Sequence, residues 1–238
     1  MTSFSLPVQR QAGLLLMVMA CAAFLSSCVS PSGDRALVNR VVVANYVKPE
    51  VARFSVGWTA FGNQGSEKET LPGLDARLKT LVKGEAKGRF KDVVFLESPP
   101  EPPAPRLTWV DPAETYWDFA KSLAATHHAD AVMLVLPVGG VPYGVPNYMS
   151  AKGLAVYHTK TGGATPQAYM TVMVLNGKTG RRYGLGGVLP RALPLALPWK
   201  PKLADYSAAE QKLMSDTLAE LFSIQLRKGI DSQGFPAR

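Results

Sequence analysis

Apolar segments that read as strands alternate along the chain with segments of helical period. Strands are predicted where branched apolar and aromatic residues cluster, at 40–47, 53–61, 92–97, 131–138, 154–159, 167–176 and 181–189. Helices are predicted where apolar residues recur every three or four positions, at 71–87, 112–128 and 207–228. The unbroken apolar run Ala131–Val138 is typical of a central strand that is buried on both faces.

Local signals mark where these elements begin and end. Asp111 followed by Pro112 is typical of a helix start, and Ser207 with Glu210 three residues later forms a predicted capping box. The sequence "NGKTG" at 176–180 predicts a hairpin turn, with two glycines available for positive φ. No internal repeat is visible in the sequence.

The N-terminus has the layout of an export signal. Arg10 precedes the apolar stretch Ala12–Leu25, which is shorter than the roughly 20 residues that a membrane span needs. Leu25-Ser26-Ser27-Cys28 then resembles the lipobox of bacterial lipoproteins. An ordinary secretory signal with a chance cysteine and a buried N-terminal helix with a core thiol are the alternatives.

The lipobox resemblance implies cleavage before Cys28 and attachment of acyl chains to that residue. Residues 1–27 would then be a signal peptide, 28–38 a tether and 39–238 a single domain. Val29 is not the aspartate that retains such lipoproteins at the inner membrane, so the resemblance implies the periplasmic face of the outer membrane. Cys21 would leave with the signal, which excludes disulfides, cysteine nucleophiles and cysteine-bound metals from the mature chain.

Charge narrows the range of partners only a little. Residues 1–27 carry Arg10 and no acidic residue, so their removal lowers the formal net charge from +8 to +7. This charge favours anionic lipid or glycan only weakly. Nucleic acid is not expected as a partner, because no dense basic stripe with interleaved aromatics occurs and the predicted compartment lies outside the cytoplasm.

Two proline-rich loops, 98–106 and 190–201, interrupt the predicted domain. The first, "SPPEPPAPR", cannot join a helix or a central strand and should be extended and exposed. It is long for an internal connection. Two interpretations remain for it, a strap that binds a partner and a stiff surface loop.

The order of elements and several motifs resemble the lipoprotein module shared by the curli secretion protein CsgG, the activator LpoB and the N-terminal domain of TolB. The opening strand "FSVGWTAFGN", the helix-to-strand element "FAKSLAATHHADAVMLV" and the hairpin "YMTVMVLNGKTGRRY" carry the resemblance, which spans about residues 53–228. The chain departs from the pattern at Thr59-Ala60-Phe61, where that family has an apolar-Pro-Phe turn.

This resemblance implies an α/β fold, an α+β sandwich in which helices pack on a mixed β-sheet. It also implies an accessory, assembly or regulatory role through contact with an envelope protein, and no enzymatic activity. A secretion-pore subunit is an alternative, although "LAVYHTKTGG" lacks the strict alternation of a membrane-inserting hairpin. An envelope enzyme acting on glycan or lipid is a second alternative.

The sequence offers little support for metal, cofactor or nucleophile chemistry. His127 and His128 are adjacent on a predicted helix and point about 100° apart, so they rarely ligate one ion, even with Asp130 nearby. Asp111 and Glu114 are explained by their place at a helix start. No G-x-S-x-G or phosphate-loop motif occurs. Neither a metal nor a cofactor is therefore expected.

Two short segments supply the candidate partner-binding residues. Tyr143, Tyr148 and Met149 lie in the glycine- and proline-rich loop 139–153, where aromatic and methionine side chains suit an interface unless the loop folds back on the sheet. Arg181 and Arg182 follow the hairpin turn and face opposite ways, so one of them suits an acidic partner or a solvated sheet edge.

Overall fold

A mixed β-sheet forms the centre of the fold. The computed structural model describes residues 34–57, 62–105, 112–142, 145–159, 163–184 and 193–237. Its strands are β1 (Arg40–Asn45), β2 (Glu50–Val56), β3 (Gln64–Gly65), β4 (Glu69–Thr70), β5 (Asp92–Phe95), β6 (Ala131–Pro137), β7 (Gly139–Gly140), β8 (Ala151–Thr159) and β9 (Ala164–Asn176).

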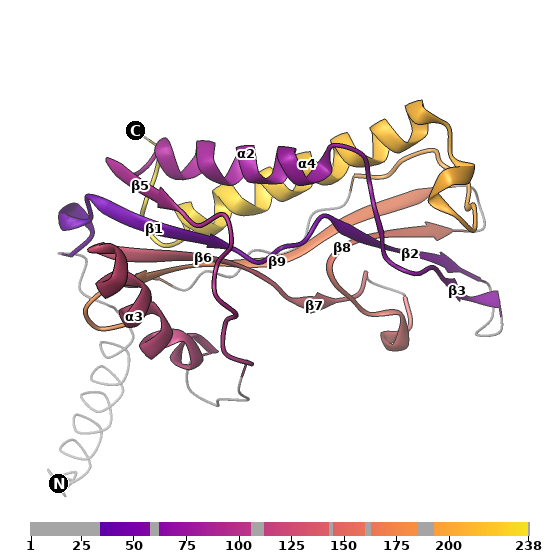
Figure 1. Ribbon diagram of the computed structural model, residues 1–238. Helices are drawn as coiled ribbons and strands as arrows, with labels where there is room; N and C mark the ends of the chain where they lie inside the picture. Colours follow the sequence, from indigo (N-terminus) through magenta and orange to yellow (C-terminus); the bar gives the residue numbers. More distant parts are fainter. Residues whose placement is uncertain are drawn as a thin grey trace, which may run out of the picture. The chain divides into compact units, whose positions relative to one another are not determined.

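These described strands form one nine-stranded sheet in the order β3-β2-β8-β9-β6-β1-β5, with β4 paired to β2 and β7 paired to β8. Three α-helices pack on the sheet (Figure 1), and this arrangement confirms the predicted α/β fold. The compact unit begins at Arg35, four residues before the predicted domain boundary.

The sheet consists of two halves that share β9. Both β6 and β8 pair antiparallel with β9: β6 pairs with its residues Met170–Asn176, and β8 pairs with its residues Ala164–Tyr169. In turn β1 pairs in parallel with β6, and β2 pairs in parallel with β8. The long strands of the two halves are therefore separated by two breaks, one at 46–49 between β1 and β2 and one between β6 and β8, where the two-residue strand β7 pairs with β8.

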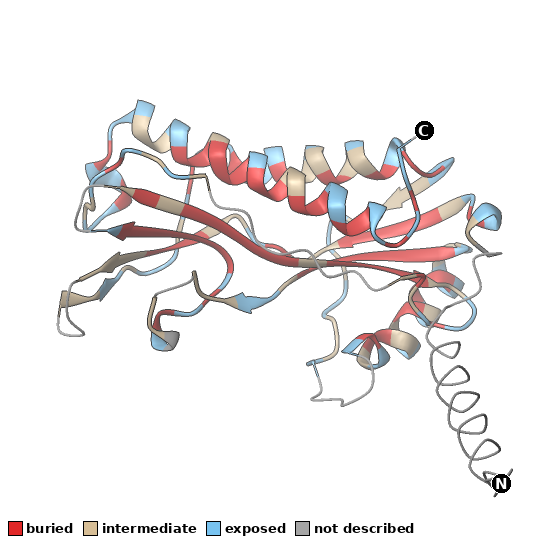
Figure 2. Cartoon of the chain, turned by 180° about the vertical axis from the view of Figure 1, so that it is seen from behind, coloured by how far each residue is buried: buried red, intermediate tan, exposed pale blue. Residues whose placement is uncertain are grey.

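One face of the sheet carries a continuous core beneath two helices. The helices α2 (Leu74–Lys87) and α4 (Ala208–Asp231) lie on this face (Figure 1), and the side of α4 that faces the sheet is buried (Figure 2). Ser207 caps α4 through the predicted capping box with Glu210. None of the helices among the described residues is both long and apolar enough to cross a membrane.

The opposite face carries two separate apolar clusters. Helix α3 (Trp117–His127), preceded by the 3-10 helix η3 (Pro112–Tyr116), packs on β1, β6 and the end of β9. The 3-10 helix η4 (Asn147–Met149) and its neighbours cover the other half, over β8 and β2. A gap is left between the two clusters on this face.

The prediction of a strand at 181–189 is wrong for the part that is described, 181–184. Arg182 makes one isolated bridge to Leu175, and the "NGKTG" turn before it forms as predicted, with Gly180 at φ +73°. The side-chain amide of Gln233 donates to the Val172 carbonyl and its oxygen accepts from the Val174 N–H. That side chain occupies the edge of β9 where a further strand would pair.

Candidate binding groove

A groove of about 920 Å³ borders the apolar cluster under α3 and extends to Gly139 and Lys152. It is lined from both breaks in the sheet, from β9, from η3 and from the proline-rich segment 99–105. Its volume lies at the upper end of the roughly 300–1,000 Å³ that ligand pockets usually have.

The floor of the groove is apolar. Leu136 is buried there, whereas the neighbouring Val138 remains 36% exposed. Met173 and Thr171 reach the groove from β9. An exposed valine beside buried apolar residues leaves carbon surface that a ligand can cover.

One wall of the groove is formed by residues 99–105 of the predicted proline-rich loop, which the structure describes from 98 to 105. It contains no helix or strand and is partly exposed, as predicted. The hydroxyl of Tyr46 donates a hydrogen bond of 2.9 Å to the carbonyl of Pro100 and so attaches the loop next to the end of β1. Burial raises the pKa of Tyr46 to about 12, so the hydroxyl remains a donor even in mildly alkaline solution.

Two lysines give the groove a positive character. Lys48 lies in the first break and Lys152 at the start of β8, and both side chains are exposed. Neither forms an ion pair with the part of the chain that the structure describes. Glu101 is the acidic residue among those that line the groove, so the lining carries a net positive charge.

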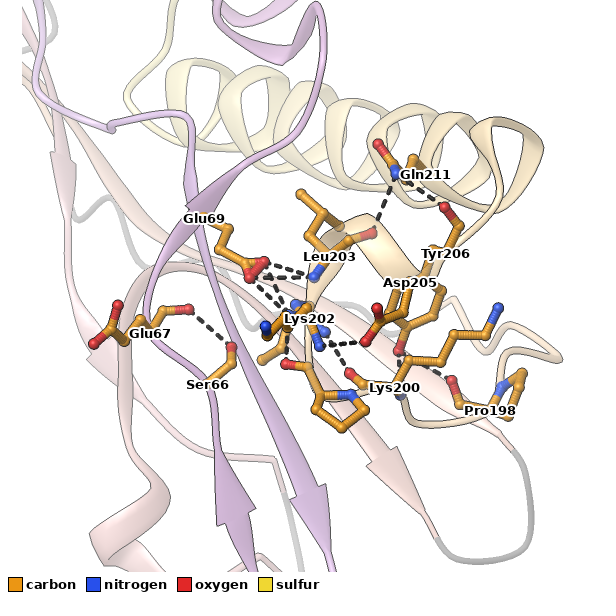
Figure 3. Close-up of polar contacts among 12 residues, drawn as sticks. Ser66, Glu67, Glu69, Pro198, Lys200, Lys202, Leu203, Asp205, Tyr206 and Gln211 are labelled. Atoms are coloured by element: carbon orange, nitrogen blue, oxygen red, sulfur yellow. Dashed lines mark hydrogen bonds and ion pairs between the residues drawn. The ribbon is translucent and has the colours of Figure 1, made fainter.

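A second polar cluster lies on the opposite face of the sheet and is structural. Arg53 is 1% exposed, and its guanidinium donates to both carboxylate oxygens of Glu69 at 3.0 Å. It also donates to the carbonyls of Lys200 and Pro201. Glu69 in turn accepts from the Leu203 N–H at 2.7 Å, a contact drawn in Figure 3. These bonds hold the second proline-rich loop against β2.

His158 is buried beside this cluster. Its Nδ1 lies 3.3 Å from the carbonyl of Leu197, and its ring meets Trp199 edge-on. Burial, with a smaller contribution from the nearby Arg53 charge, lowers the pKa of His158 to about 4. The imidazole is therefore neutral at physiological pH.

The partner-binding residues predicted in loop 139–153 differ from one another in exposure. Tyr148 is 66% exposed, as expected of an interface residue, and its hydroxyl accepts a hydrogen bond from Asn63. Met149 is buried against β8, so the expectation that it is exposed is wrong. The loop folds back at this point because Met149 completes the apolar cluster over β8. Tyr143 lies outside the described residues.

The predicted arginines lie far from Tyr148. Arg181 is exposed and its guanidinium stacks over the Trp117 ring, 5.6 Å from the centroid, whereas Arg182 is half-buried. Arg182 forms a β-bridge with Leu175, near the C-terminal end of β9. Tyr148 is hydrogen-bonded to Asn63, which follows β2 and lies near the N-terminal end of β9. With ~3.3 Å per strand residue, roughly 30 Å of β9 separates the two groups.

The remaining sequence candidates are not gathered into a site. Cys28 lies outside the described residues. His128 ends α3 at φ +50°, and Asp130 accepts from the N–H groups of Asn39 and Arg40 at the start of β1. Across the described ranges, no group of histidine, cysteine, aspartate and glutamate side chains is arranged to hold a metal ion.

Sequence reasoning missed the groove itself. Its residues come from segments far apart in the chain, and the only signal for it was the proline-rich loop that forms one wall. A scan of the sequence against protein-family models finds no match, and a search of curated proteins finds none either.

Proposed function

We propose that the chain is a lipid-anchored lipoprotein of the bacterial outer membrane whose α/β domain binds an envelope protein, in an accessory, assembly or regulatory role. The observation that carries the proposal is the groove between the two halves of the sheet. It combines exposed apolar surface with two lysines that have no ion pair within the described residues, which are features of a binding site for a partner.

The groups that line the groove suit holding a ligand better than moving protons. Tyr46 has its pKa raised to about 12 and its hydroxyl is committed to the Pro100 carbonyl. A general base needs a pKa near the working pH and a free lone pair directed at the substrate. This side chain therefore positions the loop and does not activate a substrate.

Two further features support the proposal. The helices packed on a mixed sheet agree with the sandwich that the resemblance to CsgG, LpoB and TolB implies. The lipobox-like Leu25–Cys28 supports an anchor, since two or more acyl chains, at ~0.8 kcal/mol per buried CH₂, hold a protein stably on a bilayer.

The anchor is tested by labelling with radioactive palmitate in a bacterial host. The wild-type chain should carry label and fractionate with the outer membrane, and Cys28→Ala should carry none and leave that fraction. Ser30→Ala, outside the lipobox, serves as the control. Label that persists in Cys28→Ala would contradict the lipoprotein assignment.

The partner is tested by chemical crosslinking in intact envelopes of the native host. One envelope protein should crosslink to the wild-type chain in stoichiometric amounts and be identified by mass spectrometry. Detergent extracts that contain ring-shaped oligomers of this chain would favour the secretion-pore alternative. The absence of any crosslinked protein would overturn the binding role.

A further inference from the structure

The groove exposes part of a strand edge as well as apolar side chains. Pairing between β1 and β6 ends at Val135, whose carbonyl accepts from the Tyr46 N–H, whereas β6 continues to Pro137. By strand alternation, Pro137 is the next residue whose carbonyl faces the β1 side, and proline has no N–H to offer. An extended chain in the groove finds a backbone acceptor at this edge.

The charge of the groove selects the side chains of such a segment. Lys48 lies in the first break and Lys152 at the start of β8, both line the groove, and neither is neutralised by an ion pair within the described residues. Carboxylates placed beside both ammonium groups gain attraction, and basic side chains are repelled. Val138, which lines the same groove, offers exposed apolar surface for one uncharged side chain.

We propose that the groove binds an extended, acidic segment of the partner polypeptide, with an apolar side chain on Val138 and carboxylates beside Lys48 and Lys152. This inference rests on the proposed function, because it names the chemistry of the partner. The proline wall favours it, since proline rings present carbon and few donors to a ligand.

Other anionic ligands fit the groove less well. A glycan needs many hydrogen-bonding partners for its hydroxyls, and a floor of leucine, valine and methionine with a proline wall supplies few. An anionic lipid uses the apolar floor and the lysines but makes no use of the strand edge at Pro137. Both remain as outcomes of the test.

The segment is identified by photo-crosslinking in the native host. The full chain carries p-benzoylphenylalanine in place of Val138, or, as the matched control, in place of Leu213 on α4, which is 44% exposed. The crosslinked peptide is then mapped by mass spectrometry. We expect the probe at Val138 to attach to a partner segment that has at least two aspartate or glutamate residues close to the attachment point.

Binding is then measured with a synthetic fluorescent copy of the mapped segment and the full chain purified in detergent. Fluorescence anisotropy should show that Lys48→Glu/Lys152→Glu weakens binding about tenfold or more, and that higher salt weakens the wild-type binding. The control Lys87→Glu/Lys178→Glu changes the net charge equally at exposed lysines outside the groove, and should leave the affinity unchanged.

Several results would overturn the inference. They are a crosslinked segment without acidic residues, attachment of the Val138 probe to lipid or glycan, and equal effects of the two lysine pairs. If the chemical crosslinker captures a partner while the Val138 probe attaches to no protein, the binding role stands and the groove assignment fails. If no crosslinker captures a protein, both fail.

Discussion

A single buried charge determines how the second proline-rich loop is attached. Arg53 is almost completely buried on a strand, where a cation is tolerated only when it is paired and hydrogen-bonded. Glu69 supplies the pairing and also accepts from the N–H of Leu203, two residues after the loop. The pair is therefore expected to matter more for stability than the ion pairs on the protein surface do.

We predict that Glu69→Ala lowers the free energy of unfolding by about 3 kcal/mol, because it leaves the Arg53 guanidinium buried without its counter-charge. Urea denaturation at pH 7 measures the change. The control is Glu67→Ala, an exposed glutamate two residues earlier, which should change stability by less than about 0.5 kcal/mol. Equal effects of the two substitutions would show that the buried pair adds nothing.

Acid should weaken the fold through His158. Its pKa is about 4 in the folded chain and about 6.5 when unfolded, so the unfolded state binds the proton more readily. Stability is then lost as the pH falls from about 6.5 to about 4. Arg53 from β2 and the Tyr206 ring face the imidazole, and neither is an anion that can compensate the new charge.

We predict that this histidine contributes about 2 kcal/mol to the stability lost between pH 7 and pH 5. Urea denaturation of the wild-type chain and of His158→Gln at both pH values isolates that contribution. The comparison is needed because carboxylates whose pKa is lowered by hydrogen bonds from lysines also lose stability in acid, namely Glu97, Asp118, Glu210 and Asp216. The same pH dependence in both chains would contradict the prediction.

At the scale of elements, α4 approaches the sheet most closely at a glycine. A Cβ on Gly229 would lie 2.9 Å from the Cβ of Val172 on β9, a buried and branched side chain that cannot swing away. Gly84 in α2 has no neighbour within 4 Å of the corresponding position. The two helices thus offer the same substitution with opposite expected results.

We predict that Gly229→Ala destabilises the fold by about 1–3 kcal/mol through overpacking, whereas Gly84→Ala stabilises it by about 0.5–1 kcal/mol through helix propensity. Thermal unfolding of both variants measures the difference. Val172→Ala should restore part of the stability lost in Gly229→Ala. Stabilisation by Gly229→Ala would show that α4 is not seated on β9 at this point.

The elements with a clear period could be predicted from the sequence, and those fixed by tertiary contacts could not. Ala131–Pro137 and α4 were predicted because unbroken apolar runs and capping boxes are local signals. The strand expected at 181–189 has the right composition, but the side chain of Gln233, distant in the sequence, already occupies the edge of β9. Local composition carries no information about such competition for an edge.

At the scale of the whole molecule, the groove is a product of topology. It exists because the face opposite α2 and α4 is covered in two separate places, and no single segment of sequence records that gap. In the sequence alone, Lys48 and Lys152 look like ordinary solvated lysines. Only the folded arrangement of β1, β6 and β8 places both of them at the groove. The composition of the first proline-rich loop makes it stand out in the sequence, whereas nothing in the sequence marks the residues that face it across the groove.

The start of the domain can be tested by truncation. Val38 is buried in the core and Arg35 donates to the carbonyl of Tyr183. We predict that a chain beginning at Asp34 unfolds in one cooperative transition, and that a chain beginning at Asn39 is less stable by about 2 kcal/mol or more. Denaturant midpoints of the two chains measure this. Identical midpoints would place the boundary at residue 39, as the sequence predicted.

The position of β9 in the chain also constrains the time course of folding. Val41 of β1 pairs with Ala131, about 90 residues later in the chain. The strands β6 and β8 are joined in one sheet only when β9, which pairs with both, has been made. Such long-range pairing is slow, because the chain loses the entropy of loop closure before it gains the stabilising contacts between the strands. A nascent chain therefore leaves β1 without β6 until residue 137 has emerged, and leaves the apolar strand β6 without β9 until residue 176 has emerged. We expect such a chain to depend on holding chaperones during synthesis and to fold only after it is complete.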